Sequence, residues 1–287
     1  MSVRRRRGEE QRQKQLKVKR LLVVVILLVV TILVITFLYN LENMKVVYKN
    51  YMQEWPLPSL SKTVKWGEAP SFPSESFPDS RNYVSKKKLT RDIILYIFRN
   101  HPSQKIAKVL YGDREVIYGC EYYPSTSIVA EFKPVADEID ENGYLIDPRP
   151  AFVMNCQLLE ELLHNPQAVV LFWTYLTHEH VHYEQWQTRL ASGEKKVSGQ
   201  PNSCEGMWQA ELEAYQTQCK LLVDWGIKGQ ILSGEMCGYA KTPHFAQALF
   251  LEMSKNATIK EMFHTSGKGC FPVWAKLAGH PHPESYK

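Results

Sequence analysis

The sequence predicts an α+β fold in which several short strands precede two long helices. Segments between residues 114 and 156 are rich in strand-forming residues and are separated by turn-forming residues. In contrast, the stretch 167–191 contains no Gly, Pro, Asn or Asp to turn the chain. It is too long for a strand of about 3–10 residues, so it predicts a helix. Because strands and helices are grouped rather than alternating, we expect the α+β class.

Positive charge is concentrated at the start of the chain. Residues 1–20 contain nine Lys and Arg and two Asp and Glu, whereas the remaining residues contain 26 basic and 28 acidic side chains. A nucleic-acid-binding protein carries its positive charge on the folded domain, so we expect no nucleic-acid partner. The basic tail instead suits the cytoplasmic side of a membrane.

Residues 21–39 contain no charged side chain and predict one transmembrane helix, since about 20 apolar residues span the hydrocarbon core. A cleaved signal peptide is the alternative. Its apolar core would be only about 7–15 residues long and would end in a small-residue cleavage site, which "NLENMKVVYKN" lacks. We favour an uncleaved signal anchor with a cytoplasmic tail. The rest of the chain would then lie in a periplasm, at a cell surface or in a secretory lumen.

Residues 40–88 predict a stalk, because prolines interrupt any regular element there. The folded domain is then expected over residues 89–287. It begins with a helix over 90–101, "TRDIILYIFRNH", for which Thr90 is a possible N-cap. The prolines of the stalk are Pro56, Pro58, Pro70, Pro73 and Pro78.

The next elements are short. The segments 114–123 and 126–134 read as strands, and 140–150 is rich in turn residues. The apolar run 151–156 could be another strand, and 157–165 is predicted to be helical. Strands therefore come before the helices that carry the candidate chemistry.

Two long helices complete the prediction. The first begins at Asn165-Pro166, with Asn as the cap and Pro at the first helical position, and no Gly or Pro follows until Gly193. The second runs from Ser203 to Gly226, where glycine suits a left-handed helix end.

All six cysteines follow the apolar segment. An even number outside the cytoplasm predicts up to three disulfides with 15 possible pairings, and buried free thiols are the alternative. On a continuous helix Cys204 and Cys219 would lie about 22 Å apart, so each must pair elsewhere. The six are Cys120, Cys156, Cys204, Cys219, Cys237 and Cys270.

The first long helix contains an HExxH motif formed by His178, Glu179 and His182. On a helix the two histidines lie one turn apart on one face and can bind the same Zn²⁺. Glu179 would lie beside the metal, where it can take a proton from a bound water. His180 is turned about 200° from His178 and cannot join the site.

A strand is the alternative for this motif. His178, His180, His182 and Glu184 would then line one face, with a spacing similar to the first motif of cupins. The preceding "VVLFWTYL" is also rich in strand-forming residues. The length without a turn residue and the lack of flanking glycines or a second cupin motif favour the helix.

With HExxH and the E-x-x-A segment 211–214, the chain resembles the gluzincin metallopeptidases. The resemblance implies a zincin-like domain with a small mixed sheet and metal-binding helices, which would follow the transmembrane helix predicted over 21–39. It also implies that Glu211 is the third zinc ligand, with Glu213 and then Glu205 as alternates. In many gluzincins an Asp four residues after this glutamate orients a histidine, but here that position is Tyr215. Gln218 is a candidate for the missing support.

The resemblance further implies a peptidase that hydrolyses a peptide or protein substrate, and the anchor predicted over 21–39 would hold it on a membrane with its domain outside the cytoplasm. Glu179 would act as the general base on a zinc-bound water. An edge strand before the metal helix binds substrate in gluzincins, and 151–155 is the candidate here. His280 is the candidate for stabilising the oxyanion. A non-catalytic zincin-shaped binding domain and a cupin-like metal site remain the alternatives.

Overall fold

In a computed structural model of the chain, the described residues all belong to one compact unit, Leu57–Lys287. The predicted tail and apolar segment, 1–20 and 21–39, lie outside the residues that the structure describes. Among the described residues, no helix has the length and apolar character needed to cross a membrane. The described residues are 57, 64, 67–68, 70, 77–82, 85–112, 115–123, 128–141, 144–194, 201, 203–227, 234–255 and 269–281.

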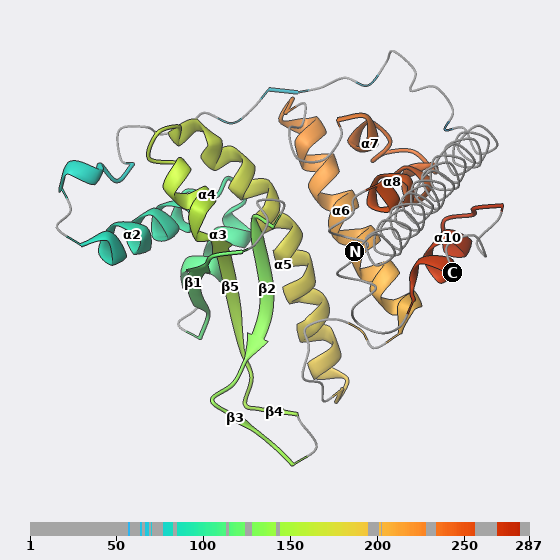
Figure 1. The fold of residues 1–287 in the computed structure, drawn as a ribbon, viewed down its shortest axis with the longest axis horizontal. Coiled ribbons are helices and arrows are strands. Elements are labelled where there is room, and N and C mark those ends of the chain that lie inside the picture. The colour runs from blue at the N-terminus through green and yellow to red at the C-terminus, as the bar shows by residue number, and fades with distance from the viewer. Residues whose placement is uncertain are drawn as a thin grey trace, which may run out of the picture. The chain divides into compact units, whose positions relative to one another are not determined.

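The fold is α+β, with the strands before the long helices as expected (Figure 1). Helix α5 lies between the sheet on one side and helix α6 on the other. The helical elements are η2 (Ser80–Asn82), α2 (Lys86–Arg99), α3 (Gln104–Gly112), α4 (Cys156–Glu161), η3 (Pro166–Ala168), α5 (Val169–Ala191), α6 (Cys204–Asp224), α7 (Gly234–Gly238), α8 (Phe245–Lys255) and α10 (Phe271–Leu277). The strands are β1 (Ile117–Glu121), β2 (Ala130–Val135), β3 (Glu138–Ile139), β4 (Leu145–Ile146) and β5 (Arg149–Asn155).

The main sheet has the order β1-β5-β2, with β5 parallel to β1 and antiparallel to β2. The run 151–155 is therefore in the central strand, and its prediction as the substrate-binding edge strand is wrong. Both edges of β5 are already paired, because β1 and β2 hydrogen-bond to it on either side. The edge strand beside α5 is β2 (Figure 1).

Two predicted helix starts differ from the structure. Helix α2 begins at Lys86 rather than near Thr90, because the Ser85 side chain caps it by accepting a hydrogen bond from the backbone N–H of Lys88. Thr90 lies inside the helix and donates its hydroxyl to the carbonyl of Lys86. The predicted start at Pro166 is a 3₁₀ turn, and the α-helix itself begins at Val169.

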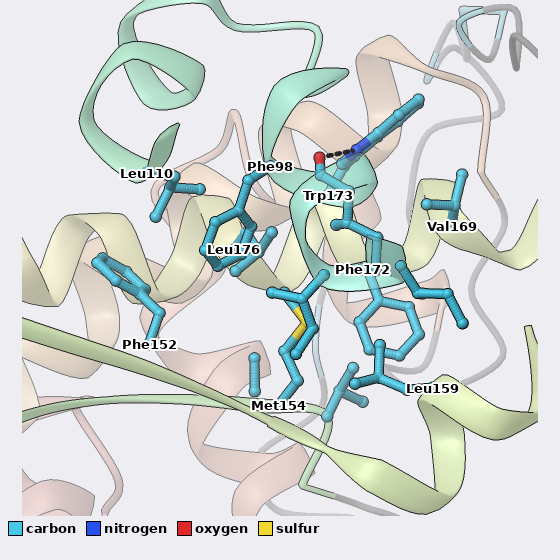
Figure 2. Packing of buried hydrophobic residues seen from close by; sticks show 14 of the residues in the cluster. Phe98, Leu110, Phe152, Met154, Leu159, Val169, Phe172, Trp173 and Leu176 are labelled. Carbon is cyan, nitrogen blue, oxygen red and sulfur yellow. Dashed lines mark hydrogen bonds between the residues drawn. The ribbon is translucent and has the colours of Figure 1, made fainter. Parts of the chain in front are cut away.

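A hydrophobic core fills the space between the sheet, α2, α3, α4 and α5 (Figure 2). Phe152 of the central strand and Trp173 of α5 are almost fully buried in it. The indole N–H of Trp173 donates to the carbonyl of Ile97 at 2.8 Å, so the one polar atom of this ring is satisfied (Figure 2). Because Tyr183 and Trp186 also belong to this core, α5 is fixed against the sheet on both sides of the histidines.

Disulfides connect α6 to the elements that follow it. Cys204 pairs with Cys270, and Cys219 pairs with Cys237, so the expectation that these two helix residues have separate partners is confirmed. The third disulfide joins Cys120 of β1 to Cys156 at the start of α4. Closed loops of these lengths each stabilise the fold by about 2–4 kcal/mol.

Helix α6 has the predicted ends. Ser203 caps its start by accepting a hydrogen bond from Gly206, and Gly226 follows its end with a φ of 64°. Gly226 has a second reason to be glycine, because a Cβ there would lie 1.9 Å from the carbonyl oxygen of Gly67. Gly67, in the predicted stalk, also donates its N–H to Val223, so this residue packs on the end of α6.

Buried His101 predicts a loss of stability in mild acid. Its Nδ1 accepts from the N–H of Ser103 and its Nε2 donates to the carbonyl of Trp173, so the ring is neutral. Burial lowers its pKa from 6.5 to about 4. The unfolded chain therefore takes up a proton as the pH falls below 6.5, whereas the folded chain does not until about pH 4. The free energy of unfolding should fall by roughly 3 kcal/mol across this window.

Urea denaturation at about pH 7.5 and about pH 4.5 measures this effect. His101→Gln should have a smaller loss between the two pH values than the wild type. His164→Gln is the control, because His164 is exposed. An equal loss in the wild type and in His101→Gln would contradict the assignment.

Candidate metal centre

Helices α5 and α6 bring three ligand side chains together. The Nε2 atoms of His178 and His182 are 3.1 Å apart, and carboxylate oxygens of Glu211 lie 3.6 Å from each of them. All three side chains are buried, with exposed fractions of 6%, 7% and 6%. This buried cluster could hold a metal ion. Because 169–191 is an α-helix, the cupin-like strand alternative is wrong.

The spacing of these atoms fits a small tetrahedral ion. Zinc binds imidazole nitrogen and carboxylate oxygen at about 2.0–2.2 Å, which places neighbouring ligand atoms of a tetrahedron about 3.4 Å apart. The three observed separations, 3.1, 3.6 and 3.6 Å, lie on either side of this value. The donor set of two nitrogens and one oxygen is also the kind that zinc accepts in catalytic sites.

Glu211, and not Glu213, faces the histidines. Glu213 is exposed and lies on another face of α6, where its Oε2 accepts a hydrogen bond of 2.9 Å from the Nε2 of Gln185. The same Gln185 nitrogen lies 3.3 Å from the carbonyl of Ala210, and the Gln185 Oε1 is 3.0 Å from the Nδ1 of His182. Glu213 is therefore connected to His182 through an amide on the side away from the cluster.

His178 is supported differently. Its ring packs edge to face on Tyr215, with 4.4 Å between centroids and 70° between planes. Tyr215 occupies the position at which many gluzincins have Asp, and burial, followed by the negative charge of Glu211, raises its pKa well above the usual value. Gln218 is fully buried, but its amide has no hydrogen-bond partner among the described residues, so nothing here supports its predicted role.

Glu179 lies beside the cluster and is fixed by the sheet. Its Oε2 accepts a hydrogen bond of 2.7 Å from the backbone N–H of Phe132 in β2, and its Oε1 lies 4.0 Å from the Nε2 of His178. One carboxylate oxygen is thus held by the edge strand, while the other faces the cluster. Burial raises the pKa of Glu179, although the neighbouring His178 and His182 oppose the shift.

The charges of the cluster are coupled. Burial alone would raise the pKa of Glu211, but His182 and His178 outweigh it and hold this pKa far below its usual range. Burial would likewise lower the pKa of His182, but Glu211 outweighs it and raises the pKa to about 9. Without a metal the cluster is therefore held together by a carboxylate–imidazolium pair. A cation that binds there has to displace the proton of His182.

The remaining predicted residues lie elsewhere. His180 points away from the cluster, as expected, with its Nδ1 3.6 Å from Glu184. His280 is not a member of the three-residue cluster. His280 is buried just after α10, where its ring centroid lies 6.1 Å from that of Phe250 in α8. Its backbone N–H donates a hydrogen bond to the carbonyl of Ala275. A catalytic role for His280 remains a prediction.

Two partners of the site were not predicted from the sequence. Gln185 could have been found, because it lies three residues after His182 and so on the same side of the helix. The backbone N–H of Phe132 carries no side-chain signal and depends on the position of β2 next to α5. The chain matches no family model, and searches of curated proteins and of solved structures find no match to it.

Proposed function

We propose that this chain is a membrane-anchored zinc metallopeptidase, similar to the gluzincins, that hydrolyses peptide bonds outside the cytoplasm. One observation carries the proposal. A buried cluster of His178, His182 and Glu211 lies beside Glu179, whose carboxylate is fixed by the N–H of Phe132. A structural zinc site would instead be closed by four protein ligands, commonly cysteines. All six cysteines are in disulfides.

The chemistry follows from the positions of these groups. His178, His182 and Glu211 would hold the ion and leave one position open. A bound Zn²⁺ supplies a water of lowered pKa and polarises the substrate carbonyl. The Oε1 of Glu179 is positioned to take the proton of that water and to return it to the leaving amine. Its Oε2 stays on the Phe132 N–H, so the carboxylate does not have to reorient between the two transfers.

Two further features support the cellular setting. Three disulfides are typical of domains outside the cytoplasm, and the uncharged segment 21–39 suits a membrane anchor. The substrate is proposed to be an extended peptide beside β2, because this edge strand passes directly over Glu179. His280 remains the candidate for the oxyanion.

Removal of the metal tests the proposal. Dialysis of the full chain against a chelator is expected to abolish hydrolysis of a quenched fluorescent peptide library, and stoichiometric Zn²⁺ should restore it. The non-catalytic alternative predicts zinc binding without hydrolysis of any peptide in the library. Hydrolysis that persists in protein shown to contain no metal would contradict the proposed mechanism.

A further inference from the structure

We infer that Gln185 and Glu213 form a positioning pair that holds His182 as a metal ligand and raises the affinity of the site. Gln185 contacts the ring of His182, and Glu213 contacts Gln185. Neither residue belongs to the three-residue cluster, so their role would be to orient a ligand rather than to bind the ion. The inference rests on the proposed function only in that His182 binds a metal.

The direction of each hydrogen bond in this chain of contacts is determined. The nitrogen end of the Gln185 amide lies between two groups that can only accept, the carbonyl of Ala210 and the carboxylate of Glu213. A flipped amide would place its oxygen against both acceptors, so the amide has one allowed orientation. Its Oε1 therefore faces His182 and must accept the Nδ1–H of that ring. The Nε2 of His182 is then the nitrogen that binds the ion, once its proton has been displaced.

Residues of helix α6 therefore contact both ring nitrogens of His182, one of them directly and the other through Gln185. Glu211 faces the Nε2 of His182 at 3.6 Å, and Glu213, two residues later, reaches the Nδ1 through Gln185. His178 has no equivalent partner, because its buried Nδ1 has no hydrogen-bond partner among the described residues. Of the two histidines, only His182 has its Nδ1 held by a side chain among the described residues, so loss of that hydrogen bond should weaken metal binding directly.

Zinc affinity, measured by competition with a chromophoric chelator, tests this role. Gln185→Leu is expected to bind Zn²⁺ about 10–100-fold more weakly than the wild type. Gln187→Leu is the matched control, because Gln187 lies on the same helix, is exposed and donates to Tyr183 instead. The control should remain within about twofold of the wild type. Glu213→Leu changes an exposed residue and should weaken Zn²⁺ binding severalfold. This second variant tests the inference even if Gln185→Leu does not fold.

A double variant separates positioning from general damage to the helix. In Gln185→Glu with Glu213→Gln, the new carboxylate accepts from the Nδ1–H of His182 and from the new amide, so only the longer contact to Ala210 is lost. Zinc affinity should recover to within about threefold of the wild type. Gln185→Glu alone places two carboxylates together and should bind more weakly than the double variant.

Nuclear magnetic resonance provides a second measurement that needs neither activity nor bound metal. The Nδ1–H of His182 should be protected from solvent exchange in the wild type and should exchange rapidly in Gln185→Leu, and His182→Ala assigns the signal. Wild-type zinc affinity in both Gln185→Leu and Glu213→Leu, or a protected signal in Gln185→Leu, would overturn the inference. A protein that binds zinc and hydrolyses no peptide would overturn the proposed function and leave the inference intact.

Discussion

Replacing Glu179 by Gln is expected to lower the rate of peptide hydrolysis by at least about a hundredfold while the metal stays bound. The amide cannot take a proton from water, but its oxygen can still accept the hydrogen bond that Phe132 donates. The side chain should therefore keep its position and lose only its basicity. Steady-state kinetics on the peptide that the wild type cleaves best, together with the metal content of each protein, measure both parts of the prediction.

Glu184→Gln is the control for this variant. Glu184 lies on the same helix, and its ion pair with Lys105 and its contact with His180 lie outside the candidate metal centre. A half-exposed pair of this kind contributes little to stability, so the control should keep its activity. Wild-type activity in a folded, metal-containing Glu179→Gln protein would exclude Glu179 as the base.

The pair of variants Glu211→Gln and Glu213→Gln should differ strongly in metal affinity. Glu211→Gln removes the negative charge that lies 3.6 Å from both imidazoles, so we expect a loss of at least about a hundredfold. Glu213→Gln keeps an acceptor for Gln185 and removes only a remote charge, so we expect a loss of at most about tenfold. Titration calorimetry with Zn²⁺ measures both values.

The two glutamates provide a strict comparison, because they lie two residues apart on one helix and are changed in the same way. Circular dichroism should show equal helix content in both variants, since neither substitution alters the caps of α6. Equal affinities, or a larger loss for Glu213→Gln, would show that the third ligand has been assigned to the wrong residue.

Local signals were sufficient for the two long helices, α5 and α6, whereas α3, α7, α8 and α10 were not predicted. The cap at Ser203, the glycine after α6 and the long segment without turn residues each act within a few residues of the element they define. The same kind of signal was misread at Thr90, because Ser85 is an equally good cap one turn earlier and the three lysines that follow it extend the helix.

The order of the strands could not be predicted in this way. An apolar run such as 151–155 shows that a strand is buried but does not say which neighbours pair with it. That choice depends on contacts between segments distant in sequence, such as the pairing of β5 with both β1 and β2. The candidate edge strand was misplaced for this reason.

The residues of the site also differ in whether local signals or contacts between distant segments determine their positions. The two histidines were predictable, because an i, i+4 pair needs only a helix to converge. Glu211 was expected from a resemblance, since α6 carries several glutamates and only the packing of α6 against α5 selects one of them. The hydrogen bond from Phe132 to Glu179 joins residues 47 positions apart and uses a backbone group that every residue except proline has.

Anomalous diffraction at the zinc edge from crystals of the zinc-loaded domain tests the central claim most directly. We expect one strong peak about 2.0–2.2 Å from the Nε2 atoms of His178 and His182 and from a carboxylate oxygen of Glu211, with a coordination position open toward Glu179. A peak elsewhere in the domain, or an ion closed off by a fourth protein ligand, would contradict it.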